Sequence, residues 1–220
     1  MIHFLSSKEL QDFPRLQRTM FRDRAEQFKI RLKWDVRVNS YGEEYDSYDA
    51  MNPIYVILKG PDGSHRGSMR LMPTTGPCML NDHFHHLIPS GTLADERIWE
   101  CTRFCVNPKF GDKVAPILML AGSVFMEKMN LTHFAGVFDR PMVRVYSRIG
   151  ASPQIISSHG TGIRKVSFGL WKYSKEAKLA LEEKIGQESR KFENIIPKSP
   201  SEDKIPTHSN GKILEPLMAS

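Results

Sequence analysis

The chain has few cysteines and no segment that predicts export or membrane insertion. Its three cysteines, Cys78, Cys101 and Cys105, form neither a CxxC pair nor an even disulfide framework. We therefore expect reduced thiols in a cytoplasmic protein. The stretch MIHFLSSKELQDF reaches acidic and polar residues too early for a signal peptide, and no apolar run is long enough to span a membrane.

The chain also lacks a basic stripe interleaved with aromatic residues, which binders of single-stranded nucleic acid need. The formal net charge is +6, but basic and acidic residues alternate along the chain. Residues 175–220 contain eight Lys and Arg and eight Asp and Glu, so the excess charge lies in the first part. We expect no nucleic-acid partner. The positive charge suits a catalytic pocket or an acidic carrier partner.

Motifs for covalent catalysis, phosphate binding and metal binding are absent as well. The sequence contains no GxSxG, P-loop or paired GxGxxG motif. His83, His85 and His86 have neither an i, i+4 partner nor a carboxylate frame, which indicates surface histidines and no metal site. Cys101 and Cys105 lie in an apolar strand without an activating histidine motif, and we expect core thiols there.

The length fits one domain, which we place at residues 1–174. Residues 175–220 are expected to form a solvated charged helix followed by a proline-rich, disordered tail. Apolar spacing predicts a helix over residues 10–32. Further along, the predicted elements are a β-hairpin at 53–73, strands at 97–107, 132–139, 154–158 and 166–173, and helices at 114–129 and 141–150. This order predicts an α/β fold, a three-layer α-β-α sandwich with a mixed central sheet.

The segment FRDRAEQFKIRLKWDV, residues 21–36, mixes arginines with aromatic residues. In a continuous α-helix, Arg24, Phe28 and Arg31 share one face. That face either buries Phe28 with the arginines at the edge of the core, or binds a ligand that carries a carboxylate and an adenine or sulfonium group.

The segment EEYDSYD contains Asp46 and Asp49 just before the hairpin. It is either a solvated acidic loop or a source of partners for buried arginines. Arg70 is such an arginine, since it lies between Met69 and Leu71 in a predicted strand, and an unpaired buried charge is costly.

The segment WECTRF places Glu100 and Arg103 on opposite faces of a regular strand, unless a β-bulge intervenes. A buried glutamate with a raised pKa can act as a base toward an amine. A structural ion pair fits this pattern equally well.

Together these segments resemble the acyl-homoserine-lactone synthases, the autoinducer synthases of bacterial quorum sensing. The resemblance covers about residues 1–172 and includes, in family order, FRDRAEQF, LKWDV, EYDSYD, NPIYVI, GSMRLMPT, ML-ND-HF and WECTRF. It implies a GNAT-like fold and the transfer of an acyl chain from acyl carrier protein, or less often coenzyme A, to the amine of S-adenosylmethionine. The carboxylate of the methionine moiety then displaces methylthioadenosine and closes the lactone. S-adenosylmethionine is a substrate here, and no cofactor or covalent enzyme nucleophile is required.

The resemblance also implies roles for the singled-out residues. Glu100 is expected to draw a proton from the amine, directly or through water, and backbone N–H groups at a strand edge to steady the oxyanion. The residues expected to shape the S-adenosylmethionine pocket are Arg24, Phe28, Trp34 and Arg103. The charged network expected to order the N-terminal segment over this pocket, as a substrate lid, consists of Asp46, Asp49 and Arg70. The implied catalytic set is Glu100, Arg103, Asp46, Asp49 and Arg70.

An acyl pocket is expected between the sheet and the helices. Its predicted lining is Met79, Phe84, Phe104, Met119, Val137, Phe138, Val145, Tyr146 and Ile149. Family members that make 3-oxo products tend to have threonine in the strand that corresponds to FAGVFD, whereas Gly136, Val137 and Phe138 have no hydroxyl group. A 3-oxo substrate is therefore less favoured. Chain length, an alkyl or aryl acyl group, the donor and the oligomeric state stay open.

Two other functions fit parts of the sequence. A GNAT N-acyltransferase that uses acetyl-coenzyme A needs a glycine-rich pyrophosphate loop, but the corresponding segment, NPKFGDKVAP, has one glycine and two prolines. A basic nucleic-acid-binding module would bind DNA with a steep dependence on salt, and the sequence has no motif for it.

Overall fold

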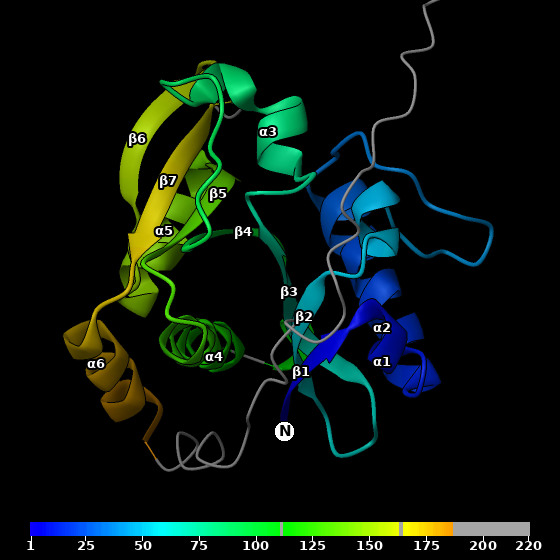
Figure 1. The fold of residues 1–220 in the computed structure, drawn as a ribbon. Helices are drawn as coiled ribbons and strands as arrows, with labels where there is room; N and C mark the ends of the chain where they lie inside the picture. The colour runs from blue at the N-terminus through cyan, green and yellow to red at the C-terminus, as the bar shows by residue number, and fades with distance from the viewer. Residues whose placement is uncertain (111, 163–164, 187–220) are drawn as a thin grey trace, which may run out of the picture.

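A seven-stranded mixed sheet forms the centre of the protein (Figure 1). The structure is a computed structural model and describes residues 1–110, 112–162 and 165–186. The strand order is β1-β2-β3-β4-β5-β7-β6, and β4 pairs with β5 in parallel while the other pairs are antiparallel. The strands are β1 (Ile2–Ser6), β2 (Ile54–Lys59), β3 (His65–Pro73), β4 (Ile98–Val106), β5 (His133–Asp139), β6 (Gln154–His159) and β7 (Val166–Lys172).

Helices cover both faces of the sheet, which confirms the three-layer α/β prediction. Figure 1 shows α1 and α2 on one side of β1–β3 and α4 on the other. The α-helices are α1 (Ser7–Leu10), α2 (Pro14–Arg24), α3 (Met79–His83), α4 (Val114–Lys128), α5 (Arg140–Ile149) and α6 (Lys175–Ile185). The other helical turns are a π-helix, η1 (Ala25–Arg31), and the 3-10 turns η2 (Ser47–Ala50), η3 (His85–Leu87) and η4 (Pro108–Phe110).

The predicted hairpin, strands and central helices are present. The sequence analysis missed β1, which pairs with β2, and the short helix α3. Helix α5 ends at Gly150, whose φ of 85° is the left-handed conformation that favours glycine at a helix end. Alternating apolar residues, turn residues and a helix C-cap predict secondary structure reliably where tertiary packing does not override them.

The prediction of one continuous helix over residues 10–32 is wrong, because the structure has the helix α2 followed by the π-helix η1. Pro14 begins α2 at its first position, because proline fits the first turn of a helix but not its interior. After Arg24 the chain continues as the π-helix η1, whose wider turn changes the angular spacing of side chains. Phe28 is buried in η1 while Arg31 is exposed, so these residues and Arg24 do not share one face as predicted.

Strands β4 and β5 pair only at one end. Ile98–Glu100 pair with His133–Ala135, and beyond this point β4 continues along β3 while β5 continues along β7. Gly136 lies where the two strands separate, and an added Cβ there would lie 2.9 Å from the carbonyl oxygen of Cys101. The separation opens a space in the middle of the sheet.

A β-bulge follows on β4, where the pairing with β3 shifts register between Ser68 and Arg70. Arg103 has a φ of 52°, a left-handed conformation that is strained for a residue with a side chain. The bulge considered in the sequence analysis is therefore present, and it ends the strict alternation of faces along WECTRF.

Helix α6 packs on the domain and is not solvated on all sides, contrary to the prediction. Leu181 and Ile185 are buried in the main core cluster, which α4 also lines. The predicted disordered tail lies largely outside the described residues.

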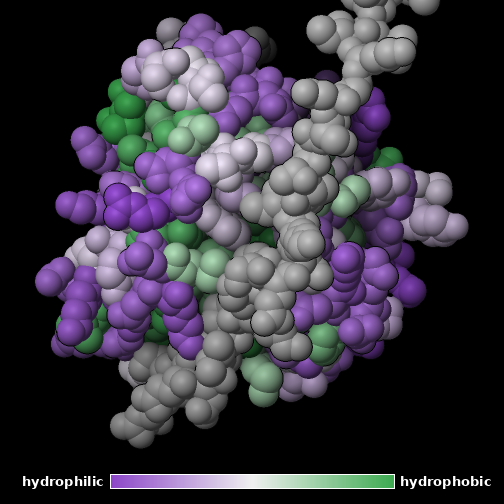
Figure 2. Space-filling model, viewed as in Figure 1, coloured by the Kyte–Doolittle hydropathy of each residue, from purple (hydrophilic) through white to green (hydrophobic). Residues whose placement is uncertain are grey.

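In the described part of the chain, no helix is long and apolar enough to cross a membrane. Figure 2 shows a largely hydrophilic face with small hydrophobic areas, one of them over β6.

The close approach at Gly136 predicts a stability effect. A methyl group at Gly136 meets backbone, which cannot rotate away, so Gly136→Ala should lower the free energy of unfolding by about 1–3 kcal/mol in urea denaturation. Gly76→Ala is the control, since no atom lies within 4 Å of its added Cβ. Equal stability of the two variants would contradict the tight β4–β5 contact.

Candidate active site

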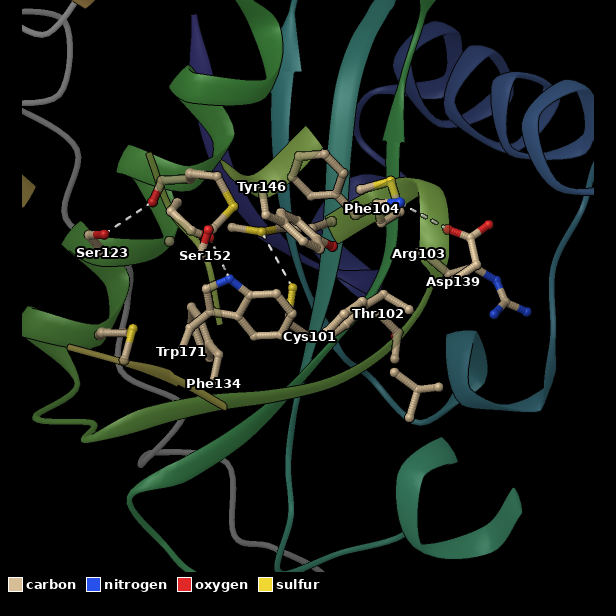
Figure 3. A pocket seen from close by; sticks show the side chains of 18 of the residues that line it. Cys101, Thr102, Arg103, Phe104, Ser123, Phe134, Asp139, Tyr146, Ser152 and Trp171 are labelled. Atoms are coloured by element: carbon tan, nitrogen blue, oxygen red, sulfur yellow. Dashed lines mark hydrogen bonds between the residues drawn. The ribbon is translucent and has the colours of Figure 1, made fainter. Parts of the chain in front are cut away.

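A cavity of about 180 Å³ occupies the space where β4 and β5 separate (Figure 3). Figure 3 shows Arg103 toward one end of it and Ser123 and Ser152 toward the other. The polar or charged lining includes Gln27, Thr102, Arg103, Ser123, Asp139, Ser152 and Lys172. The rest is mainly apolar, with Phe28, Leu32, Trp34, Met69, Met79, Cys101, Phe104, Met119, Met126, Phe134, Val137, Phe138, Met142, Tyr146, Trp171 and Leu181.

Of the nine residues predicted to line an acyl pocket, six line this cavity: Met79, Phe104, Met119, Val137, Phe138 and Tyr146. The other three do not. Phe84 packs against the cluster below α3 and η3, and Val145 and Ile149 belong to the main core. Helix α5 presents Met142 and Tyr146, four residues apart, to the cavity. Val145 and Ile149 share the i, i+3, i+7 stripe of this helix with Met142 but pack in the main core, so neither apolar character nor helical spacing separates pocket from core.

An aromatic pair covers the Arg103 end of the cavity. The rings of Phe28 and Trp34 stack with their centroids 5.1 Å apart, and the guanidinium carbon of Arg103 lies 5.5 Å from the Phe28 centroid. The backbone N–H of Trp34 donates to the carbonyl oxygen of Phe28 at 2.8 Å, with Lys33 at a φ of 58°. Phe28 is buried, whereas Trp34 is 37% exposed. Both rings line the cavity, so they form a partly open aromatic wall.

Behind this wall lies a buried network of ion pairs. Arg24 donates from Nε to Glu44 at 2.6 Å and from its two terminal nitrogens to Asp49 at 2.9 and 2.8 Å. Only 1% of Arg24 is exposed. The bidentate geometry fixes α2 to the loop before β2. Tyr55 on β2 donates a further hydrogen bond, at 2.6 Å, to Asp49.

Two arginines from the sheet complete the network. Arg70 on β3 donates to Asp46 at 2.5 and 3.0 Å and to Asp49 at 2.9 Å. Arg103 on the β4 bulge donates to Glu44 at 2.9 Å and lies 2.8 Å from Asp46. The arginine–carboxylate network is thus balanced in charge and contains Arg24, Arg70, Arg103, Glu44, Asp46 and Asp49.

The mutual pairing outweighs the cost of burial in this network. Burial alone would raise the pKa of Asp49, but the guanidinium groups of Arg24 and Arg70 hold it well below its usual range. Burial alone would lower the pKa of Arg24 and of Arg70, but their carboxylate partners raise both. All three groups are therefore charged at neutral pH.

The pairing predicted between Arg70 and the two aspartates is present. Arg24 was predicted to line the S-adenosylmethionine pocket, but it is not among the residues that line the cavity. Its nitrogens are occupied by Glu44 and Asp49. Arg24 therefore positions the Phe28–Trp34 pair without lining the cavity, because η1, which carries Phe28, continues directly from Arg24.

Glu100 lies at the start of α3. Its carboxylate accepts the backbone N–H of Met79 at 3.2 Å and that of Leu80, and the N-cap residue Cys78 makes no side-chain cap. Glu100 thus caps α3 from the neighbouring strand. Burial raises its pKa to about 7, although the two backbone N–H groups and Arg70 act in the opposite direction. Only 1% of Glu100 is exposed, but it positions Met79, which lines the cavity.

Several residues of the site were missed from the sequence. Glu44 bridges two arginines, yet in EEYDSYD nothing distinguishes it from Glu43. Thr102 accepts a hydrogen bond from Arg70 at 3.2 Å and lines the cavity. Its position two residues after Glu100, on the same strand face, could have identified it. Ser123 and Trp171 could not be assigned without the tertiary fold.

A chain of Ser68, His65 and Asp23 has the connectivity of a hydrolase triad. The ring of His65 lies 2.9 Å from the Ser68 hydroxyl and 2.6 Å from the carboxylate of Asp23. Ser68 is buried, however, and does not line the cavity. The chain therefore ties α2 to β3 and offers no accessible nucleophile.

The surface position predicted for three histidines is confirmed, and so is the core position predicted for Cys105, which is buried. His83, His85 and His86 are exposed. Within the described ranges, no group of three or more His, Cys, Asp or Glu side chains could hold a metal ion. Burial raises the pKa of the thiol to about 11 at Cys78 and to about 12 at Cys101, so neither is a thiolate at neutral pH.

The network predicts a large loss of stability when one carboxylate is removed. Asp49→Asn leaves Arg24 and Arg70 without their shared partner and should lower the free energy of unfolding at pH 7 by about 3–5 kcal/mol. The depressed pKa of Asp49 contributes stability above its unfolded pKa, and this contribution is lost as the pH falls toward the folded pKa. The difference between the proteins should therefore shrink below about pH 4.

Urea denaturation over a range of pH measures this effect. Asp62→Asn breaks the exposed pair with Arg15 and should leave stability nearly unchanged. An Asp49→Asn protein as stable as Asp62→Asn would contradict the importance of the network.

Comparisons with known proteins identify the family and the fold of this chain. Residues 8–177 match the family model described as "Autoinducer synthase". The acyl-homoserine-lactone synthase of Rhizobium etli is 37% identical over 178 residues, which cover 78% of this chain and 84% of that protein. The acyl-homoserine-lactone synthase of Agrobacterium fabrum is 37% identical over 132 residues, which cover 59% of this chain and 58% of that protein.

Solved structures show the same fold. The coenzyme A-dependent synthase BjaI with SAM and isopentyl-CoA superposes with a TM-score of 0.75 at 24% identity, covering 84% of this chain and 89% of that one. The AHL synthase LasI gives a TM-score of 0.71 at 24% identity, covering 82% and 93%. A putative N-acetyltransferase from Lactobacillus plantarum gives 0.51 at 14% identity, covering 79% and 98%, which agrees with a GNAT-like fold. The chain therefore belongs to the autoinducer synthase family, the acyl-homoserine-lactone synthases, and is an acyltransferase.

Proposed function

We propose that this protein makes an N-acyl-L-homoserine lactone from S-adenosylmethionine and an acyl thioester, with release of methylthioadenosine. The observation that carries the proposal is one cavity with two chemically different ends. Phe28, Trp34 and Arg103 form an aromatic and cationic end, and an apolar channel runs from it between β4 and β5. Such a site suits a zwitterionic adenosyl substrate at one end and an acyl chain in the other.

The aromatic wall has the chemistry to bind S-adenosylmethionine. A stacked aromatic pair offers its faces to a sulfonium or an adenine. Arg103 is held by Glu44 and Asp46 beside this wall. Within this proposal its guanidinium provides positive potential for the substrate carboxylate, while the acidic partners keep it in place.

The reaction needs no covalent enzyme intermediate. The amine attacks the thioester carbonyl, the thiol leaves, and the carboxylate then displaces methylthioadenosine from the γ-carbon. Glu100 is our proposed base for the amine, acting through water, because its pKa of about 7 suits proton transfer at neutral pH. Its burial behind Met79 makes direct contact with the substrate unfavourable.

The surface next to the cavity favours a donor that carries phosphate. Arg140, Arg144 and Arg148 recur every four residues along α5 and are exposed. Met142 and Tyr146 of the same helix line the cavity. Coenzyme A and the phosphopantetheine arm of a carrier protein are both anionic, and both fit this charge. A cytoplasmic location, where these donors are available, is part of the proposal.

The activity is tested with the purified protein, S-adenosylmethionine and a panel of acyl-carrier and acyl-coenzyme A thioesters. We expect mass spectrometry to detect methylthioadenosine and an acyl-homoserine lactone in equal amounts. Release of free thiol without methylthioadenosine would indicate a GNAT N-acyltransferase that uses another amine, and would contradict the proposal.

The position of Trp34 in the aromatic wall predicts that its removal weakens the binding of S-adenosylmethionine and not of the thioester. Trp34→Ala removes the partly exposed half of the aromatic pair and should raise the KM for S-adenosylmethionine about tenfold, with little change in the KM for the thioester. Trp34→Phe keeps a stacking ring and should retain most of the affinity. An unchanged KM in the alanine variant would exclude Trp34 from the substrate site.

Glu100 predicts a pH dependence. A base acts when deprotonated, so the wild-type kcat/KM should rise through about pH 7, and Glu100→Gln should lower it and remove this rise. The raised pKa also means that folded stability declines as the pH rises from about 4.5 to 7, and the glutamine variant should lack this decline. A glutamine variant with the wild-type activity profile would show that Glu100 only caps α3.

A further inference from the structure

The cavity extends to α6, the helix that follows the predicted domain boundary at residue 174. Ala177 and Leu181 of α6 belong to its lining, together with Ser123 and Met126 of α4 and Trp171 of β7. The match to the family model ends at residue 177, in the first turn of α6, so Leu181 lies beyond it. The far end of the cavity is therefore built in part by a segment outside the family match.

Helix α6 is held firmly in this position. The side chain of Ser174 caps its N-terminus, and Leu181, 3% exposed, is buried in the main core. Lys178 donates to Glu127 on α4 at 2.6 Å. Lys184 donates to the carbonyl oxygens at the end of α5, those of Arg148 at 2.5 Å and Ile149 at 3.0 Å. Helix α6 thus connects α4 and α5, the two helices that flank the cavity.

This end of the cavity lies opposite the aromatic and cationic end. Figure 3 shows Ser123, Ser152 and Trp171 at the side away from Arg103. If the reacting thioester lies near Arg103, as the proposed function requires, the acyl chain points between α4 and β5 toward α6. Its terminal carbons would then meet Leu181 and Ala177.

We propose that α6 forms the end wall of the acyl pocket and that Leu181 and Ala177 set the longest acyl chain that the enzyme accepts. This inference rests on the proposed function and adds a determinant of its substrate range. Leu181 is a buried side chain whose removal would lengthen the apolar channel. Ala177 is small and lies at the exposed rim, so a larger side chain there would shorten the channel.

The size of the effect follows from the burial of methylene groups. Each methylene that gains or loses an apolar environment changes affinity about fourfold. A change in the end wall that admits or excludes two methylenes should therefore change the ratio of kcat/KM for long and short chains about 15-fold.

The test compares the wild type with Leu181→Ala, Ala177→Leu and the control Leu179→Ala, which truncates an α6 leucine that is 54% exposed and does not line the cavity. Each protein receives S-adenosylmethionine and an equimolar mixture of acyl-coenzyme A and acyl-carrier thioesters from four to fourteen carbons. Mass spectrometry measures the lactones, and thermal unfolding confirms the fold of each variant.

We expect Leu181→Ala to shift the products to longer chains and Ala177→Leu to shift them to shorter chains, each about 15-fold in the long-to-short ratio. Leu179→Ala should stay within about twofold of the wild type. If Leu181→Ala does not fold, Ala177→Leu, at an exposed position, still tests whether α6 limits the length of the acyl chain.

The experiment distinguishes failure of the proposed function from failure of the proposed role of α6. Wild-type protein that makes no lactone from any donor would overturn the proposed function, and with it this inference. Wild-type protein that makes lactones, with folded α6 variants that keep its chain-length profile, would overturn the role of α6 alone. A shift in Leu179→Ala as large as in Leu181→Ala would overturn it as well.

Discussion

Buried charge is stable in a protein only where it is paired, and the site of this enzyme depends on that constraint. Three guanidinium groups from α2, β3 and the β4 bulge meet three carboxylates from the segment before β2. Because each carboxylate contacts two arginines, and each arginine two carboxylates, moving any side chain of the set breaks two ion pairs at once. The pairing fixes η1 and its Phe28 against the sheet, and so places the aromatic wall at one end of the cavity. Under the proposed function, the residues that stabilise this part of the fold also position the wall that binds the substrate.

The cavity itself follows from strand geometry. Strands β4 and β5 pair over three residues each and then separate, which opens the sheet where the β4 bulge lies. The bulge brings Arg103 to the network, while Thr102 stays in register opposite Arg70. The space between the strands is closed by α4, α5 and α6, and it receives the methionines and aromatic rings of these elements. An aromatic and cationic end and a channel lined mainly by apolar side chains, in one cavity, suit the two halves of the proposed reaction.

Local patterns in the sequence predicted the hairpin, the central helices and the α/β class, since alternation and turn residues act over a few positions. The resemblance implied a charged network of Arg70, Asp46 and Asp49, and the structure joins these residues. It did not imply that Arg103 is part of this network, where it pairs with Glu44 and Asp46. The features that the sequence did not predict depend on tertiary contacts between distant parts of the chain. Periodicity could not reveal the π-helix after Arg24, and apolar character could not separate Tyr146, in the cavity, from its core neighbours. Glu44 and the burial of Leu181 depend on partners far away in the chain.

We infer that the arginine–carboxylate network holds residues 25–34 against the sheet. Backbone hydrogen–deuterium exchange of the wild type and of Glu44→Gln tests it most directly, because Glu44 joins Arg24 to Arg103. If the network holds this segment, residues 25–34 should exchange faster in the variant, while β5 and β7 exchange at the wild-type rate. Exchange at residues 25–34 that stays at the wild-type rate, or that rises equally throughout the chain, would contradict it.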